Sequence, residues 1–128
     1  LLPNYIYSNN RDLTFSNKQK EWGLTAPAIS SGAVYADLDN DGDLDLVVNN
    51  INDNAFIYMN RGREVNNSSY LAIKLKGKKG NSNAVGSKLY LYANGSMQYQ
   101  EVNPNRGYLS CVSTVLNFGV GDNKKVDS

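Results

Sequence analysis

The apolar residues of this chain occur in short runs separated by Gly, Asn, Asp or Ser. Runs rich in Val, Ile, Tyr and Phe and bounded by turn residues are typical of strands. The pattern predicts strands at residues 5–8, 13–15, 33–37, 44–49, 55–60, 70–76, 88–93, 97–102, 109–113 and 115–118. The one predicted helix, at 17–22, has at most two turns and ends at Gly23. The predicted fold class is therefore all-β.

Two local signals extend this pattern. Asn94-Gly95 separates two alternating runs and predicts a β-hairpin with a type I′ turn. The aromatic-Ile-Tyr pattern of residues 4–9 recurs at residues 55–60, at an offset of 51 residues. A period of that length suits a propeller blade. Because the first 62 residues supply only parts of two blades, they predict a partial propeller-type blade and no closed ring.

Carboxylates are concentrated between the predicted strands at 33–37 and 44–49. Five fall within nine residues, and those at loop positions 1, 3, 5 and 9 are Asp37, Asp39, Asp41 and Asp45. Such a cluster repels itself without a counter-ion, and its alternation allows a curling backbone to aim the side chains inward. Oxygen ligands in this pattern suit a hard divalent cation, and calcium fits best because it accepts six to eight oxygens.

The other loop positions agree with a metal-binding turn. Gly42 at position 6 is expected to have a positive φ, as a sharp turn requires. Asp43 at position 7 is expected to ligate through its backbone carbonyl and to point its side chain toward solvent. Position 12 is Val48, where an EF-hand has a bidentate Glu, so the loop is predicted to join a β-hairpin instead. An acidic turn without an ion is the alternative, but its Asp and Asn residues seldom alternate so regularly.

The charge balance changes sign along the chain. Residues 1–60 contain three basic and eight acidic residues, whereas residues 61–128 contain ten basic and four acidic ones. Between them, residues 66–69 are typical of a linker. We therefore predict a blade region with a calcium hairpin at 1–65 and a small antiparallel β-domain at 66–128. The two are expected to pack together because a lone blade exposes unpaired strand edges, which also predict strand exchange or dimer formation.

Composition argues against several classes of function. The chain has no His, which removes Ser-His and Cys-His pairs and histidine-ligated zinc. Cys111 is the single cysteine, so no internal disulfide forms, and it is expected to be a buried small apolar residue. No apolar run approaches the ~20 residues that cross a bilayer. The lysines at 74–79 have no aromatic residues among them, so an exposed strand end is favoured over nucleic-acid binding.

The remaining motifs favour structural roles. Residues 80–88 contain Gly-Ser-Lys where a phosphate loop has Gly-Lys-Ser, and no helix pattern follows. Residues 119–121 lack the third glycine of a dinucleotide site. The three glutamates are scattered, so a glycosidase pair is not predicted. Trp22 and residues 106–108 are candidate sugar-contacting surfaces, whereas most tyrosines are expected in the core or in cross-strand pairs.

Residues 32–50, which comprise the acidic loop and its flanking strands, resemble an FG-GAP (VCBS-type) repeat. Such repeats build the calcium-bearing propellers of integrin α-subunits and of many secreted bacterial proteins. Every acidic position of the family is filled in this chain. The resemblance implies a calcium site formed by Asp37, Asp39, Asp41, the carbonyl of Asp43, and Asp45.

The second half is similar to the ASPIC/UnbV domain that follows such repeats in cartilage acidic protein and its bacterial relatives. The matching segments are residues 70–77, 83–89, 106–110 and 117–121. Ser87 stands where the family usually has Ala, and the family continues into a Trp-Pro-Ser-Gly-like strand beyond Ser128. The chain is therefore expected to be the slightly truncated C-terminal part of a longer repeat protein. The resemblance implies no catalytic residues.

Together, these features predict a non-catalytic, calcium-stabilised module for adhesion or ligand binding, with a protein or a glycan as its partner. Extracellular calcium modules bind the ion at about 10⁻⁴–10⁻³ M, which is too weak for cytosolic calcium. The expected location is therefore extracellular, periplasmic or on the outer cell surface. Two alternatives stay open. One is a carbohydrate-binding or accessory part of a polysaccharide-active enzyme, and the other is a structural end-cap of a repeat array.

Overall fold

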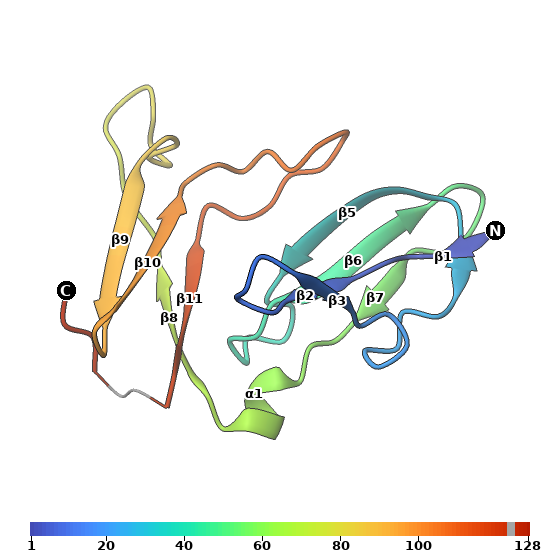
Figure 1. Ribbon diagram of the computed structural model, residues 1–128. Coiled ribbons are helices and arrows are strands. Elements are labelled where there is room, and N and C mark those ends of the chain that lie inside the picture. Colours follow the sequence, from blue (N-terminus) through green and yellow to red (C-terminus); the bar gives the residue numbers. More distant parts are fainter. Residues whose placement is uncertain (123–124) are drawn as a thin grey trace.

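The structure, a computed structural model, describes residues 1–122 and 125–128, and its regular elements are almost all strands (Figure 1). The described helix, α1, spans Gly62–Asn66. The strands are β1 (Leu2–Pro3), β2 (Tyr7–Asn9), β3 (Phe15–Asn17), β4 (Pro27–Ala28), β5 (Ser30–Ala36), β6 (Asp45–Asn50), β7 (Phe56–Tyr58), β8 (Ser69–Ile73), β9 (Lys88–Ala93), β10 (Ser96–Glu101) and β11 (Leu116–Gly121). The all-β prediction is confirmed.

Strands β1 to β7 form three small antiparallel sheets. The largest has the order β5-β6-β7, and the others are the β2–β3 hairpin and the β1–β4 pair. In the largest sheet Ala36 pairs with Asp45, so the acidic segment closes the β5–β6 hairpin as predicted. The hairpin therefore fixes both ends of the acidic loop.

The second group of strands surrounds the main apolar core. β8 pairs with β11 and β9 pairs with β10, both antiparallel. Phe118 and Val102 are fully buried, and the other buried members of this cluster are Leu91, Leu116 and Val120. At the β9–β10 turn, Asn94 and Gly95 have φ values of 50° and 72°. Two positive φ values are those of a type I′ turn, so this hairpin prediction is confirmed.

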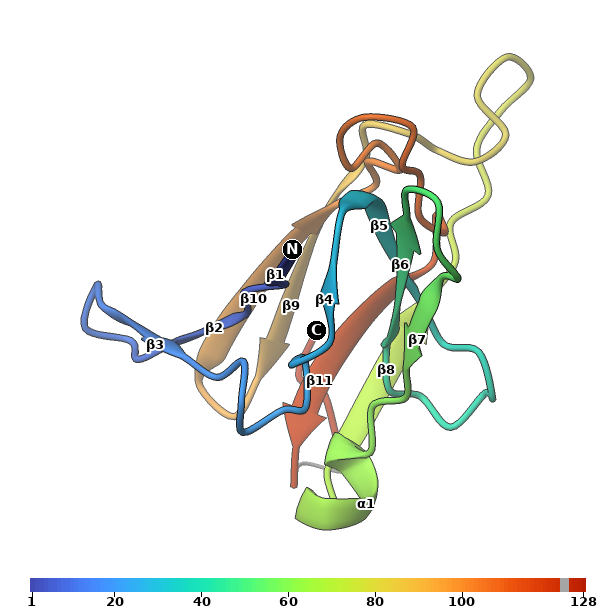
Figure 2. The same cartoon turned by 90° about the vertical axis from the view of Figure 1, so that its right-hand side faces the viewer.

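The two groups of strands lie side by side, with α1 at one end of the molecule (Figures 1 and 2). Among the described residues, no strand pair joins β1–β7 to β8–β11. Side chains join them instead. The Arg106 Nε donates to the Tyr35 hydroxyl at 2.9 Å. A Cβ at Gly32 would lie 2.9 Å from the Ser110 Oγ, so the chain approaches closely there. The two halves thus pack together through a polar contact and a glycine.

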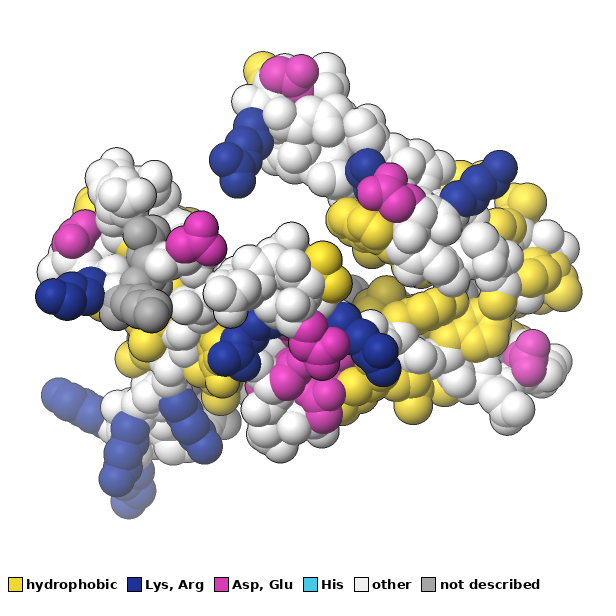
Figure 3. All heavy atoms as spheres, turned by 90° about the horizontal axis from the view of Figure 1, so that it is seen from below, with side chains coloured by type: hydrophobic (Ala, Val, Ile, Leu, Met, Phe, Trp, Pro, Cys, Tyr) yellow, Lys and Arg dark blue, Asp and Glu magenta, His cyan; other side chains and the backbone are white. Residues whose placement is uncertain are grey.

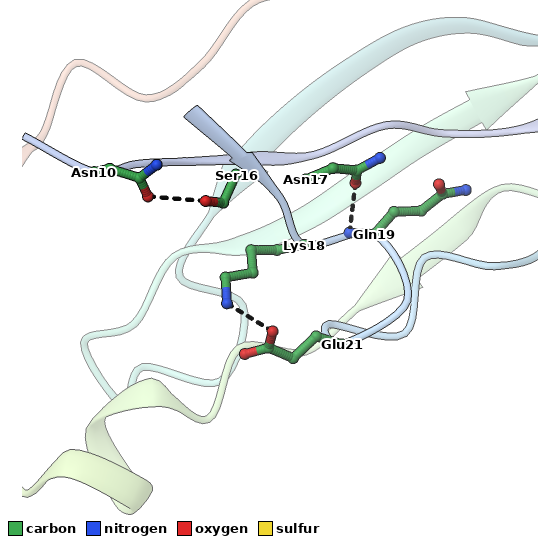
Figure 4. A network of polar contacts seen from close by, with 6 residues as sticks. All are labelled: Asn10, Ser16, Asn17, Lys18, Gln19 and Glu21. Carbon is green, nitrogen blue, oxygen red and sulfur yellow. Dashed lines mark hydrogen bonds and ion pairs between the residues drawn. The ribbon is translucent and has the colours of Figure 1, made fainter. Parts of the chain in front are cut away.

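The predicted short helix after β3 is replaced by turns. The Trp22 N–H donates to the Lys18 carbonyl at 2.8 Å, but no regular helix follows. Asn17 Oδ1 accepts from the Gln19 N–H at 2.9 Å, and Lys18 forms an ion pair with Glu21 at 2.7 Å (Figure 4). Helix nucleation is unfavourable for so short a segment. Because Asn17 belongs to strand β3 and Gly23 has a positive φ of 79°, the segment between them closes as turns.

The predicted strand at 109–113 is wrong. The chain turns there instead, with Arg106 N–H donating to the Ser110 carbonyl at 3.0 Å. Gly107 and Leu109 both have positive φ values, which a strand does not accommodate. One isolated bridge, between Asn105 and Cys111, is all the pairing described for this segment. Cys111 is consequently exposed, and the expectation that it is buried is also wrong.

The bounds of several other predicted segments also differ from the structure, most of them by one or two residues. The strand expected at 70–76 ends at Ile73, because the next residues lead into a tight turn in which the Gly77 N–H donates to the Ser82 carbonyl at 2.9 Å. The chain around the predicted linker contains α1, which is followed by Asn67 in the left-handed conformation with φ of 48°. This short helix places residues 60–70 beside the acidic loop.

Candidate metal centre

The acidic loop runs from the end of β5 to the start of β6 and is shaped by its own side chains. Asp41 Oδ1 accepts from the Asp43 N–H at 2.8 Å, and Asp39 Oδ1 accepts from the Asp41 N–H at 3.2 Å. Gly42 has φ of +95°, as predicted, and Asn40 also has a positive φ of 61°. Asn tolerates this region better than most residues. Alternating Asp residues and two left-handed positions therefore curl the loop tightly.

Three of the five predicted ligand residues converge. One carboxylate oxygen from each of Asp37, Asp39 and Asp45 lies within 4.8 Å of the other two. Asp37 is half-buried, Asp39 is exposed and Asp45 is fully buried, so the group is closed on the protein side and open to solvent on the other. Among the described residues, the carboxylate of Asp41 does not belong to this converging group.

The polar atoms of this group fit a cation. Asp37 Oδ2 accepts from the Gly42 N–H at 3.1 Å, but Asp37 Oδ1 is buried and has no hydrogen-bond partner among the described residues. A buried carboxylate oxygen without a partner is costly, and nearby like charges add repulsion. A divalent cation with oxygen ligands would satisfy this atom and cancel two of the three negative charges. The donor set therefore suits a hard metal ion.

Asp45 also has a structural role. Its Oδ2 accepts from the Leu38 N–H at 2.9 Å, and its Oδ1 accepts from the Asn60 N–H at 2.8 Å. The carboxylate thus ties the loop to the segment that follows β7. Because each oxygen can accept a second interaction, these bonds orient Asp45 and still leave it able to bind a cation.

The outer side of the loop contacts residues that the sequence did not indicate. Asp43, whose side chain was expected to face solvent, is half-buried, and its Oδ2 accepts from the Arg63 N–H at 2.6 Å. The Arg63 guanidinium donates to the Asp41 carbonyl and lies 5.1 Å from the centre of the Tyr70 ring. A Cβ at Gly42 would collide with that ring. On the face that carries α1, acidic side chains gather with basic ones on either side (Figure 3).

These contacts escaped the sequence analysis for a simple reason. Arg63 lies 20 residues beyond Asp43, and Asn60 lies 15 residues beyond Asp45. Two of the donors are backbone N–H groups, which every residue except Pro carries. No residue type or spacing therefore marks them in the sequence.

Residues 106–108 and the glutamates, the other candidates from the sequence, form no catalytic arrangement within the described part of the chain. Arg106 is engaged by Tyr35, and Tyr108 is 78% exposed. Glu21 pairs with Lys18, as a surface glutamate is expected to, and Glu101 accepts from the Tyr99 hydroxyl at 3.3 Å. Glu21 and Glu101 therefore bond to different partners.

Trp22 lies at a mainly apolar groove. Its indole is 48% exposed, and the groove has a volume of about 540 Å³. Its apolar walls come chiefly from Leu24, Leu44, Leu46, Tyr58, Met59 and Val65.

No helix within the described residues is both long enough and apolar enough to cross a membrane.

Comparison with known families gives two matches in succession. Residues 3–48 match the FG-GAP-like repeat, and this segment contains all five acidic residues of the loop. Residues 77–128 match the family described as ASPIC and UnbV. No curated protein and no solved structure matches the chain. The matched architecture is thus an FG-GAP-like repeat at residues 3–48 followed by an ASPIC and UnbV domain at residues 77–128.

Proposed function

We propose that this chain is a non-catalytic, calcium-stabilised interaction module that works outside the cytoplasm as part of a larger repeat protein. Two observations carry the proposal together: one carboxylate oxygen from each of Asp37, Asp39 and Asp45 converges, and Asp37 Oδ1 is buried without a partner. Asp41 and the carbonyl of Asp43 are the further ligands that the sequence predicts. The bound ion would cancel two of the negative charges of the loop and hold the hairpin in one conformation.

The choice of calcium follows from the ligand chemistry. Calcium accepts six to eight oxygens in flexible geometry, whereas magnesium requires a near-octahedral shell and keeps several waters. A loop with several carboxylates on a short, curled backbone suits the larger ion. Since such sites in extracellular modules bind in the 10⁻⁴–10⁻³ M range, they fill only where calcium is abundant, which supports an extracellular, periplasmic or surface location.

We also propose the domain boundary near residue 65. No described strand pair crosses it, and the two family matches lie on either side of it. The blade region, 1–65, would supply the metal centre. The ASPIC and UnbV region, 66–128, would supply the larger apolar core.

A thermal melt with and without calcium tests the proposal. At ten times the dissociation constant, binding adds about 1.4 kcal/mol to the free energy of unfolding, which raises the melting temperature by about 5 °C. EGTA should reverse the shift, and magnesium at the same concentration should produce a smaller one. Asp39→Ala removes an exposed member of the carboxylate group and should abolish the calcium response. A melting temperature that does not respond to calcium would refute the proposal.

Carbohydrate recognition is a second candidate function, and the exposure of Trp22 beside a groove favours it. Exposed indole rings stack on sugar faces, but the walls of this groove are mostly apolar. A glycan array with the wild-type protein and Trp22→Ala separates the two functions. Binding that is lost in the variant would favour this second function over a purely protein-directed one.

A further inference from the structure

The contacts of the acidic loop extend beyond the repeat that contains it. The FG-GAP-like match ends at residue 48, whereas three residues that contact the loop, Asn60, Arg63 and Tyr70, come later in the chain. We infer that these later residues position the metal-binding loop, so that cation binding stabilises their contacts with the loop and, through Tyr70, the docking of the two halves. This inference rests on the proposed calcium function.

The first contact acts on a ligand directly. The Asn60 N–H donates to Asp45 Oδ1 at 2.8 Å, and Asp45 is fully buried. A backbone donor that fixes one oxygen of a ligand carboxylate sets the direction in which its remaining lone pairs point. Outer partners of this kind commonly change metal affinity by 10- to 100-fold when they are lost.

The second contact holds the loop backbone. Arg63 approaches the loop twice, since its N–H donates to Asp43 Oδ2 at 2.6 Å and its guanidinium donates to the Asp41 carbonyl. Both acceptors belong to the stretch that the sequence predicts to bind the ion. The guanidinium charge opposes a cation while its hydrogen bond supports the loop, so Arg63 substitutions would mix two effects.

The third contact is made by the aromatic ring of Tyr70, which is uncharged, unlike the side chain of Arg63. Tyr70 packs so closely on Gly42 that no Cβ fits between them. Tyr70 belongs to β8 and pairs with Gly119 of β11. The residue next to Gly119, Phe118, is fully buried in the main apolar core. The apex of the metal loop therefore rests on the sheet of the other half. Tyr70 acts as a positioning residue because it reaches the ion only through the loop.

Thermodynamic reciprocity follows from this arrangement. If a docked Tyr70 favours the loop conformation that binds the ion, the ion favours the docked state by the same factor. Calcium would then tighten residues 60–70 and the contact between the two halves, in addition to the hairpin itself.

Calcium titration of the intact chain by calorimetry tests the inference, with Tyr70→Ala compared with Tyr70→Phe. We expect the alanine variant to raise the calcium dissociation constant about tenfold. The phenylalanine variant keeps the ring and should stay within about twofold of wild type. Tyr108→Ala, at an exposed tyrosine of the same half, is the matched control. Equal affinities for wild type and Tyr70→Ala would overturn the inference and leave the calcium function intact, whereas a wild type that does not bind calcium would overturn both.

Amide hydrogen exchange of the wild-type chain provides a second test that needs no variant. Calcium should slow exchange at the Asn60 and Arg63 amides at least fivefold more than at the amides of β9 and β10. Both amides donate to loop carboxylates and lie before residue 65, so their protection reports on the contact between the loop and residues 60–63. If calcium protects all of these amides equally, or none of them, the ion does not act on residues 60–63 and that part of the inference is overturned.

Discussion

Asp45 combines a metal-binding position with a buried structural one. Its carboxylate is fully buried and accepts from two backbone N–H groups, those of Leu38 and Asn60. Its neighbour in the carboxylate group, Asp39, is exposed and bonds only within the loop. The two residues should therefore respond differently when no metal is present.

We predict that Asp45→Ala lowers the free energy of unfolding by about 2–4 kcal/mol in EGTA, because two partly buried N–H donors lose their buried acceptor. Asp39→Ala should change it by no more than about 0.5 kcal/mol under the same conditions. Urea unfolding followed by circular dichroism measures both. Equal losses for the two variants would contradict the structural role of Asp45.

Asp12 provides a test of electrostatics at a single residue. The Thr14 hydroxyl donates to its carboxylate at 2.6 Å and the Thr14 N–H at 3.0 Å, and these bonds lower the pKa of Asp12 below its usual value. Because the folded pKa is depressed, the contribution to stability is present above the unfolded pKa, about 3.9. It is lost as the pH falls through the folded value.

We predict that Thr14→Val raises the pKa of Asp12, because it removes the hydroxyl donor and keeps the backbone one. An NMR titration of the Asp12 carboxyl signal in both proteins measures the change. A midpoint that is the same in wild type and variant would show that the hydroxyl has no part in the shift.

At the scale of elements, the β9–β10 hairpin depends on its turn. Gly95 has φ of 72°, and a Cβ added there would meet nothing within 4 Å, so only the backbone conformation disfavours a side chain. Gly119 in β11 has equally open surroundings but no positive φ. The two glycines form a matched pair.

We predict that Gly95→Ala lowers the free energy of unfolding by about 1 kcal/mol, because alanine is strained at positive φ. Gly119→Ala should have a smaller effect or a slightly favourable one. Thermal melts of the two variants distinguish these outcomes, and an equal cost would show that the turn conformation is not responsible.

Strand positions followed the sequence well where apolar residues alternate beside a clear turn. Residues 88–93 form a strand with the predicted bounds, because alternation and Asn94-Gly95 both favour it. Residues 109–113 contain similar apolar residues, but they form a turn with exposed Leu109 and Cys111. The difference is that this segment finds no strand partner beyond one bridge, and β propensity without a partner does not make a sheet.

At the scale of the whole molecule, the exposed sheet edges still predict that the chain self-associates. Among the described strands β7 pairs only with β6, and Ile57 at its centre is 61% exposed. An exposed apolar edge is a template for pairing with another chain. We predict concentration-dependent dimers by size-exclusion chromatography with light scattering.

Ile57→Lys should shift this equilibrium toward the monomer, because a charge on an edge strand opposes pairing. Ile29→Lys, at another exposed isoleucine outside β7, is the control. A wild-type chain that stays monomeric at every concentration would contradict the prediction.

The sequence by itself determined the all-β class, the position of the acidic hairpin and the positive φ of Gly42, since these depend on alternation, turn residues and spacing within a few residues. Only the tertiary structure decided which three carboxylates converge, that Asp43 points to Arg63, and that Tyr70 closes over the loop. The contacts of Arg63 and Tyr70 with the loop join segments far apart in the chain. Their geometry depends on how the two halves pack, which no local pattern records.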